Sequence, residues 1–388
     1  MSEPAPSLRH AFHWLIATLV AVHACMALTR VTASLWVLNQ GYGEWTVGVL
    51  LSLFAVAPLF LSLWAGRLAD RRGFHAPVGV GVAMALGGAV LALAWPTLAT
   101  IALSCLASGG AVSIAAVAIQ REAGLMADGS GDLKRIFSWV ALGPALSNAL
   151  SPVVAGLLID GIGYRSAFAL ALLLPLLAWG LATRVPRHVP PPAAEPERQA
   201  AAWDLLRDPK LRRLLLLNVV LSTSWDAHSF VVPVLGHARG LSASSIGLVL
   251  GAFAVAATLV RLAIVRYAAQ LDELKALRAA MALAALTLAV YAWLPGTPGL
   301  MLGSAVLGLA LGSVQPMILA TLHQVTPPQR HGQALGLRMM VTNAATIAMP
   351  LGFGALATAS VAAAPLWLMA ALLLAAQWPA RALGAGRH

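Results

Sequence analysis

Long, uninterrupted apolar segments are the feature that most restricts the fold of this chain. Runs such as Leu170–Leu181 and Met281–Leu294 contain no charged residue. Of the 388 residues, 60% are apolar and 10% are charged, whereas soluble domains are about 45–50% apolar and about 25% charged. Such a chain has too few polar side chains to cover a water-exposed surface, and it is too hydrophobic to be disordered. The sequence therefore predicts a polytopic membrane protein.

The length of the apolar runs predicts helices and not a barrel. A membrane-spanning helix needs about 20 apolar residues, whereas barrel strands alternate in polarity over about 10 residues. Allowing about 32 residues for a helix and its loop, the chain accommodates about twelve spans. We expect an all-α fold with spans at about residues 11–38, 45–66, 76–95, 98–120, 136–159, 166–184, 213–235, 244–265, 277–294, 298–321, 333–356 and 361–380.

A polar stretch divides these spans into two sets of six. We expect an N-terminal bundle at residues 1–184, a linker at 185–212 and a C-terminal bundle at 213–388. The segments Gly41–Gly48 and Gly240–Gly247 resemble each other, each opening the second span of its half, as expected of the internal repeats of transporters. Ser242 or Ser244 is the expected N-cap there.

The linker mixes proline with basic and apolar residues. Its first part holds four prolines, which favour an extended, semi-rigid chain. Its second part, Ala200–Leu217, forms either a short interfacial helix on anionic headgroups or the polar start of the next span. Both alternatives remain open at the level of sequence.

The basic residues lie mainly in alternate loops. With a cytoplasmic N-terminus, the cytoplasmic side carries Arg67, Arg71, Arg72, Lys134, Arg135, the linker cluster, Arg266, Lys275, Arg278 and Arg330, and the opposite loops hold Arg165 and Arg239. Because Lys and Arg are retained on the cytoplasmic side, we expect both termini inside. The net charge of +11 is then mostly a topology signal. Basic residues scattered among loops do not form a nucleic-acid-binding face, and anionic lipid is the partner that they suggest.

The most specific motif lies between the second and third spans. Gly66 and Gly73 enclose a stretch with Asp70, Arg71 and Arg72, and this G-x-L-a-D-r-r-G pattern resembles the signature of the major facilitator superfamily. We expect the glycines to form a tight turn in a cytoplasmic loop. The resemblance implies two six-helix bundles around a central cavity. It implies a protein that alternates between inward-open and outward-open states. It also implies that Asp70 braces the start of the eleventh span, around Gly332, with Arg121 as a cationic partner.

A second motif lies in the fifth span. Ser147-Asn-Ala-Leu-Ser-Pro-Val-Val-Ala-Gly156 resembles the antiporter motif of that superfamily, g-x-x-x-G-P-x-x-G-G. Pro152 and Gly156 match the pattern, while Ser147, Ser151 and Ala155 replace glycines. The replacements are small, so close packing and a proline bend remain possible. The resemblance favours the drug–proton antiporter type of efflux protein.

Ionisable groups inside the membrane are costly and usually functional. Asp226 is the one carboxylate deep within a predicted span, and His228 follows it in the seventh span. His23 lies in the first span, and we expect it and His228 at pseudo-symmetric mid-membrane positions. Burial favours the neutral carboxyl group and a nearby cation the ionised one, so Asp226 is the candidate proton carrier and either histidine the relay. The alternative is an ion pair of Asp226 with Arg30 that joins the two halves.

Further polar and aromatic residues are candidates for a substrate cavity. Arg30 and Arg338 would supply fixed positive charge, and the other candidates are Trp36, Trp225, Gln315 and Asn343. The first span carries His23 and Arg30 where members of the efflux branch often carry an acidic residue, which favours a neutral or anionic substrate.

These features predict a secondary transporter of the bacterial inner membrane that exports a small organic molecule in exchange for protons. The alternatives are an uptake symporter or facilitator of a metabolite, and a transporter-like protein that moves or senses lipid. We expect a monomer that contacts membrane lipids and has no nucleic-acid partner, cofactor or metal. No nucleophile–base pair, metal cluster or Walker loop stands out, so we expect neither an enzyme nor ATP-driven transport.

Overall fold

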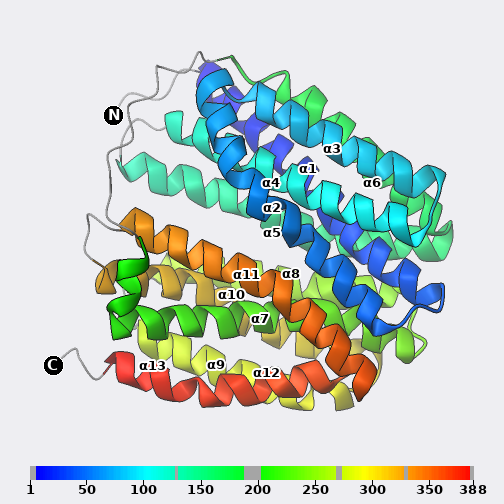
Figure 1. The fold of residues 1–388 in the computed structure, drawn as a ribbon, viewed down its shortest axis with the longest axis vertical. Helices are drawn as coiled ribbons and strands as arrows, with labels where there is room; N and C mark the ends of the chain where they lie inside the picture. The colour runs from blue at the N-terminus through cyan, green and yellow to red at the C-terminus, as the bar shows by residue number, and fades with distance from the viewer. Residues whose placement is uncertain (1–5, 127–129, 188–201, 268–272, 327–330, 385–388) are drawn as a thin grey trace. The chain divides into compact units, whose positions relative to one another are not determined.

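The computed structural model describes residues 6–126, 130–187, 202–267, 273–326 and 331–384. Figure 1 traces its helices from blue to red. In chain order they are α1 (Pro6–Asn39), α2 (Glu44–Arg72), α3 (His75–Ala94), α4 (Leu98–Leu125), α5 (Ser130–Gly161), α6 (Tyr164–Ala182), η1 (Ala202–Arg207), α7 (Pro209–Ala238), α8 (Ala243–Tyr267), α9 (Glu273–Val290), η3 (Tyr291–Trp293), α10 (Gly296–Val325), α11 (His331–Ala359), α12 (Ala364–Ala375) and α13 (Gln377–Gly384). The expected all-α membrane fold is confirmed.

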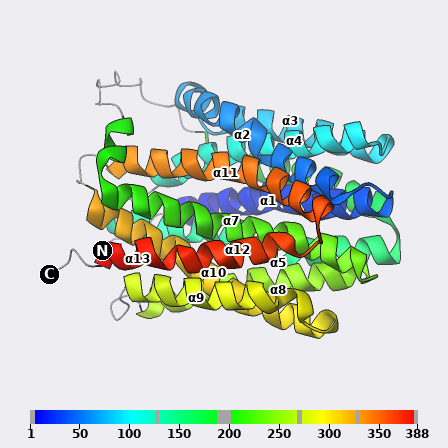
Figure 2. The same cartoon turned by 60° about the horizontal axis from the view of Figure 1, so that its bottom comes forward.

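Among the described residues, 11 helices are long and apolar enough to cross a membrane. The twelfth expected span, at about 361–380, is divided between α12 and α13, which lie in line in Figure 2. The division is slight, because Ala376 keeps helical dihedral angles and accepts a hydrogen bond from the Ala380 N–H. The 12 residues of α12 alone cover only about 18 Å at 1.5 Å per residue, less than a bilayer core of about 30 Å.

The described helices form two compact units. Unit 1 comprises Met1–Gln40, Leu53–Glu195 and Ser242–Gly247, and unit 2 comprises Gly41–Ser52, Pro196–Leu241 and Leu248–His388. The first part of α2 therefore belongs to unit 2, and the first turn of α8 belongs to unit 1. The prediction from the sequence assigned all of α2 to the N-terminal bundle and all of α8 to the C-terminal bundle, so these two assignments differ from it.

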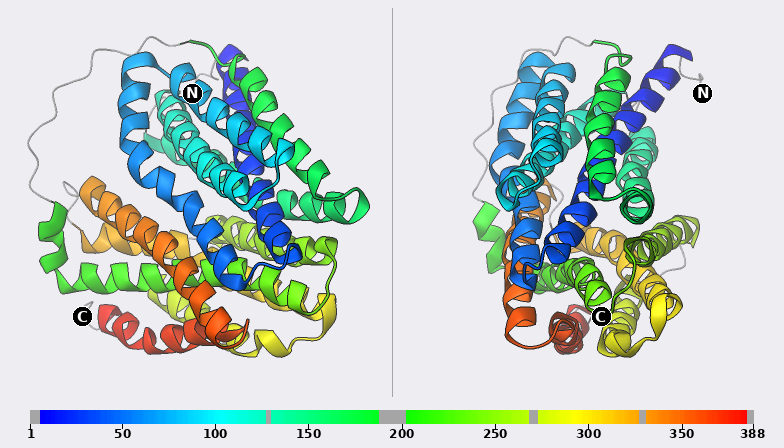
Figure 3. Two further views of the ribbon diagram at one scale, coloured as in Figure 1. Left: turned by 45° about the vertical axis from the view of Figure 1, so that its right-hand side comes forward. Right: turned by 90° about the vertical axis from the view of Figure 1, so that its right-hand side faces the viewer.

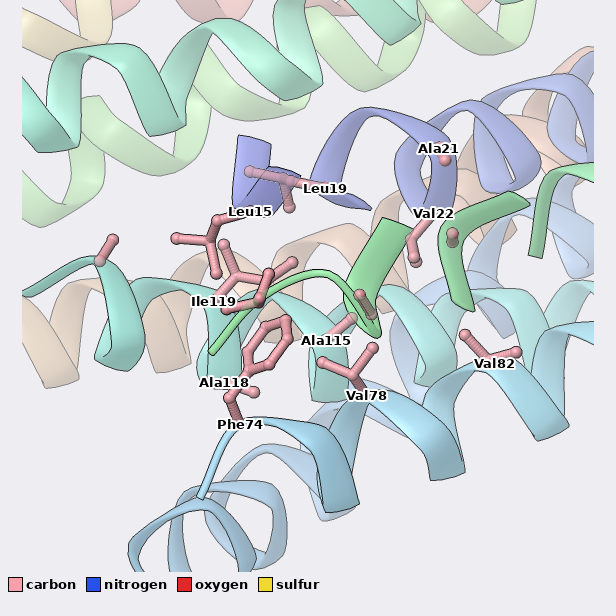
Figure 4. Packing of buried hydrophobic residues seen from close by; sticks show 14 of the residues in the cluster. Leu15, Leu19, Ala21, Val22, Phe74, Val78, Val82, Ala115, Ala118 and Ile119 are labelled. Atoms are coloured by element: carbon pink, nitrogen blue, oxygen red, sulfur yellow. The ribbon is translucent and has the colours of Figure 1, made fainter. Parts of the chain in front are cut away.

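Unit 1 is organised around α1, which packs against α4, α5 and α6, while α3 packs against α4 and α6. In both views of Figure 3, α1 is the long dark-blue helix. Figure 4 shows the apolar cluster where α1, α3 and α4 meet. It includes Leu15, Leu19, Val78, Ala118 and Ile119. Small side chains predominate among the residues that α4 contributes to this cluster. Because the hydrophobic effect does not drive helices together within lipid, small side chains stabilise the bundle by allowing close van der Waals contact.

Unit 2 has α7 as its central helix. This helix packs against α10, α11 and α12, and α9 packs against α10 and α12. Asp208 begins α7 by accepting a hydrogen bond from the Lys210 N–H at 2.8 Å. The described part of the expected interfacial stretch, Ala202–Leu217, is divided between η1 and the first turns of α7, and Ala200 and Ala201 lie outside the described residues.

The turn of the sequence signature is shorter than expected. Residues from Gly66 to Arg72 are helical and belong to the end of α2, so they do not form a loop. Gly73 alone makes the turn, with φ of +72° and its N–H bonded to the Ala69 carbonyl. A glycine favours this position because other residues are strained at positive φ. Hydropathy predicted only the apolar part of α2. The backbone hydrogen bonds of the helix continue into the polar residues that follow.

Candidate functional site

Asp226 lies in the interior of unit 2, near the middle of α7. Its side chain is 8% exposed, and its Oδ2 accepts a hydrogen bond from Thr346 Oγ1 of α11 at 3.3 Å. A carboxyl group enclosed in a membrane bundle is costly unless polar partners hold it. Asp226 is thus a buried, hydrogen-bonded carboxyl group, and its role in proton transport stays a prediction.

A second polar link joins the same two helices nearer their beginnings. Asn218 of α7 donates from Nδ2 to Thr342 Oγ1 at 2.7 Å, and Arg338 donates from Nη1 to Asn218 Oδ1 at 3.2 Å. Arg338 is half-buried and its Nε is enclosed without a hydrogen-bond partner in the described part of the chain. The guanidinium group thus has donor capacity left in a largely apolar surrounding, as an anion-binding group requires.

His228 lies on another side of α7 from these links. Its Nε2 is 2.8 Å from Ser304 Oγ of α10, and Ser304 Oγ is 2.6 Å from Tyr291 Oη of η3. The imidazole ring also stacks on Phe253 of α8, with centroids 4.3 Å apart. His228, Ser304 and Tyr291 are completely buried. The environment is that of a packed polar core, and access of protons to His228 stays a prediction.

Aromatic contacts connect this core to a cation on α8. Trp225 meets Phe253 edge-to-face at 4.4 Å, and the Arg261 guanidinium lies 5.8 Å from the Trp225 ring centroid. Arg261 also donates from Nε to the Gly312 carbonyl at 3.3 Å. An indole ring beside a guanidinium group suits a ligand with both an aromatic or apolar part and a polar part.

The unit 1 candidates on α1 are spread over several turns of the helix. His23 is partly buried, with Nδ1 enclosed and without a hydrogen-bond partner among the described residues. His23 lies on α1 of unit 1 and His228 on α7 of unit 2, and their pseudo-symmetric placement in the membrane stays a prediction. Arg30 is partly buried and Trp36 is buried. An ion pair of Arg30 with Asp226 would join the two units and stays a prediction.

The small residues of the span-five motif are packing positions. Ser147 Oγ donates to the Val20 carbonyl of α1 at 2.9 Å. Ser151 and Pro152 are buried, and the Pro152 carbonyl lies against Gly247 of α8. A Cβ atom on Gly156 would come within 2.7 Å of the Ser244 Cα. These positions therefore lie at close contacts between helices, and the antiporter role of the motif stays a prediction.

Several predictions fall on side chains that the structure does not describe. Asp70 and Gln315 lie in α2 and α10, but the positions of their side chains are outside the described part, as is the bracing contact of Asp70 near Gly332. Arg71 and Arg72 are exposed, Arg121 is half-buried at the end of α4, and Asn343 is half-buried on α11.

The sequence did not predict the buried Glu122 of α4 or the two hydrogen-bonding residues Asn218 and Thr346 of unit 2. Glu122 is 1% exposed near the end of α4, just beyond the predicted end of that span. Asn218 and Thr346 were missed because single neutral residues on a helix carry a weak signal. Asn218 is two helical turns before Asp226, on the same face of α7, and that spacing was the available clue. In the described chain, no group of three or more His, Cys, Asp or Glu is placed to hold a metal ion.

Known structures support the fold. The chain is similar to a variant of the nucleoside transporter NupG (13% identity, TM-score 0.77, covering 96% of this chain and 99% of that one). It is also similar to a bacterial metal transporter (15%, 0.70, 99% and 100%) and to the peptide transporter POT in complex with sulfate (14%, 0.76, 97% and 94%). A search of curated proteins finds no match.

The family model described as Major Facilitator Superfamily matches residues 15–297 and 214–383. Together these matches cover most of the chain, in agreement with the α2 signature and the helical fold. The chain belongs to the Major Facilitator Superfamily and is an integral membrane protein of the secondary transporter class.

Proposed function

We propose that this transporter exports a small organic molecule in exchange for protons. In this proposal it resides as a monomer in a bacterial inner membrane, with both termini in the cytoplasm. The basic residues of alternate loops support the orientation. The packed span-five motif, which resembles that of antiporters, supports the direction of transport.

The buried carboxyl group of Asp226 carries the proposal of proton coupling. The group is enclosed in the middle of a spanning helix and is bonded to Thr346 of the facing helix. Protonation would remove its charge and weaken its attraction for donors, while deprotonation would restore both. A carboxyl group that alternates between these forms can couple proton movement to helix movement.

The cations and the indole ring of unit 2 support an organic substrate that is neutral or anionic. Arg338 keeps an enclosed donor, and Arg261 lies beside Trp225. A positively charged substrate would have to approach these two fixed positive charges, which is unfavourable in a medium of low dielectric constant. An apolar or aromatic ring with a carboxylate or a carbonyl group would satisfy both the indole and the guanidinium groups.

The test first needs a substrate. A thermal-shift screen of the purified protein identifies ligands, and nucleosides and short peptides are included because structurally similar transporters carry these names. The ligand is then used in proteoliposomes with an imposed pH gradient. We expect Asp226→Asn to abolish flux driven by the gradient and to preserve exchange of labelled for unlabelled ligand, because exchange needs no net proton transfer.

Asp204→Asn is the matched control, since Asp204 is an exposed residue of η1. Unchanged gradient-driven flux in Asp226→Asn would refute the proton role. Accumulation of the ligand on the side from which protons leave supports antiport, whereas accumulation on the side that protons enter would establish uptake by symport. Movement of labelled lipid with no ligand flux would favour the lipid-moving alternative.

A further inference from the structure

The first turn of α8 has an unusual set of hydrogen-bond partners. The first N–H groups of a helix have no partner within the helix. At the start of α8 the Ser245 N–H donates to Ser242 Oγ at 3.2 Å, as expected for an N-cap. The Ala243 N–H donates to Asp160 Oδ1 at 3.0 Å and the Ser244 N–H to Asp160 Oδ2 at 2.7 Å. One carboxylate thus completes the cap that Ser242 begins.

Asp160 is not a neighbour of α8 in the sequence. It lies in the last turn of α5, 83 residues before Ala243. The beginning of α7 shows the ordinary arrangement, in which Asp208 caps the helix that follows it directly. The Asp160 carboxylate therefore does more than cap a helix, because it connects the end of α5 to the start of α8 within unit 1.

The two helices also approach closely at this end. A Cβ atom on Gly156 would overlap the Ala243 carbonyl, and one on Gly247 would overlap the Pro152 carbonyl. The backbones can touch only because these two positions lack side chains. Two charge-assisted hydrogen bonds then fix the contact, and the partial positive charge of the helix start favours a carboxylate there.

The solvent exposure of the link makes it reversible. Asp160 and Ser242 are exposed and Ser244 is half-exposed, so water can replace the partners when the helix ends separate. A buried carboxylate would lose its partners at a large cost in free energy, whereas an exposed one is rehydrated. Firm hydrogen bonding combined with access to water is the combination that a contact made and broken in each transport cycle requires.

We propose that Asp160 is a latch that holds the end of α5 to the start of α8 and opens when these ends separate during transport. In the proposed orientation this end of the helices faces the exterior of the cell. Opening of the latch during transport rests on the proposed function, whereas the link between the two helix ends does not.

The corresponding contact in unit 2 is built differently. Gly48 of α2 lies against the Pro350 carbonyl of α11, as Gly247 lies against the Pro152 carbonyl. Ser52 Oγ donates there to the Ile347 carbonyl at 2.8 Å. That bond is neutral and partly buried, so the charged carboxylate distinguishes the α5–α8 contact.

Hydrogen exchange measured by mass spectrometry on the purified protein in detergent tests the latch without any substrate. Two segments are followed, residues 153–162 at the end of α5 and residues 240–247 at the start of α8. Asp160→Ala should accelerate exchange in both segments, with a change of about tenfold or more at the start of α8, because two donors lose their acceptor and the helix ends separate. Ser242→Ala is the comparison variant, since it removes the cap of the Ser245 N–H and one hydroxyl bond to Asp160 but leaves the two backbone donors to the carboxylate.

Because the two backbone donors to Asp160 remain in Ser242→Ala, the expected result is faster exchange mainly in the α8 segment. Asp160→Asn keeps one acceptor oxygen and should give an intermediate effect in both segments. This variant also provides the test if the alanine variant does not fold. If Asp160→Ala or Asp160→Asn changed only the α8 segment, or neither segment, the latch would be refuted. These results do not depend on Asp226 or on the coupling ion, so failure of the latch and failure of the proposed function are distinguishable.

Discussion

His228, Ser304 and Tyr291 show how single polar residues are accommodated inside a membrane bundle. Each of them is fully buried in unit 2, and Ser304 lies within hydrogen-bond distance of both of the others. A polar group left unpaired in a low-dielectric interior costs more free energy than the hydrogen bond itself contributes. The three side chains therefore form one hydrogen-bonded group, in which His228 Nδ1 alone is enclosed without a hydrogen-bond partner among the described residues.

Removing one member of this group should have a moderate effect on stability. Tyr291→Phe deletes a hydroxyl group but leaves Ser304 bonded to His228, so we expect a loss of about 1 kcal/mol in the free energy of unfolding. Tyr164→Phe is the control, because its hydroxyl group bonds to the Leu35 carbonyl at 3.2 Å but the residue is only partly buried. Thermal unfolding in detergent should show a lower Tm for Tyr291→Phe, and equal Tm values for the two variants would contradict this account.

The sequence located the buried ionisable residues better than it located their partners. Asp226 and His228 stood out because charge and imidazole are rare in apolar runs. Asn218, Thr346 and Ser304 did not stand out, since neutral hydrogen-bonding residues occur throughout membrane helices. Their roles depend on contacts between helices, such as Thr346 of α11 with Asp226 of α7, and no local pattern encodes such contacts.

Helix pairs in both units are joined by the same kind of glycine contact. Gly109 of α4 lies against the Phe54 carbonyl of α2, and Gly308 of α10 lies against the Phe253 carbonyl of α8. Each residue of the first pair has its counterpart about 200 residues further along the chain, as an internal repeat predicts. The close contact between backbones is thus a repeated structural element and not an isolated feature.

Adding a methyl group at these glycines should separate the helices. We expect Gly109→Ala and Gly308→Ala each to destabilise the protein by about 1–3 kcal/mol, because the Cβ atom would overlap a backbone carbonyl that cannot move alone. Gly87→Ala is the control on α3, where a Cβ atom would meet nothing within 4 Å. Replacing glycine by alanine in an open helical position stabilises the helix by roughly 0.5–1 kcal/mol. A Tm that falls equally in all three variants would contradict the packing argument.

Hydropathy predicted the helices well and their ends less well. The membrane requires about 20 apolar residues of each span, but backbone hydrogen bonds continue wherever the chain can form them. Helix α2 therefore extends to Arg72 through the polar signature. The last predicted span is interrupted at Ala376, a residue whose type gives no sign of a break.

At the scale of the whole molecule, the basic residues of alternate loops predict an orientation with both termini in the cytoplasm. The family was recognisable because the α2 signature, the span-five motif and the repeated spans agree with one another. The assignment of the start of α2 to unit 2 and of the start of α8 to unit 1 was not recognisable, because both contacts involve glycines that lie far from their partners in the sequence, and the α8 contact also involves one distant carboxylate. Such contacts are properties of the assembled bundle.

The predicted orientation can be tested by introducing one exposed cysteine at a time. The native Cys25 and Cys105 can stay in place, because they are 1% and 0% exposed and should react slowly with thiol reagents. Ile162→Cys introduces a thiol between α5 and α6 at a position that is 78% exposed. Asp204→Cys introduces one in η1 without removing a basic residue. With both termini in the cytoplasm, a membrane-impermeant maleimide should label Ile162→Cys in intact cells and Asp204→Cys only after the membrane is opened, because Lys and Arg retain their loops inside. The reverse pattern, or labelling of both positions in intact cells, would overturn the orientation and with it the location of the Asp160 latch at the outer end of the bundle.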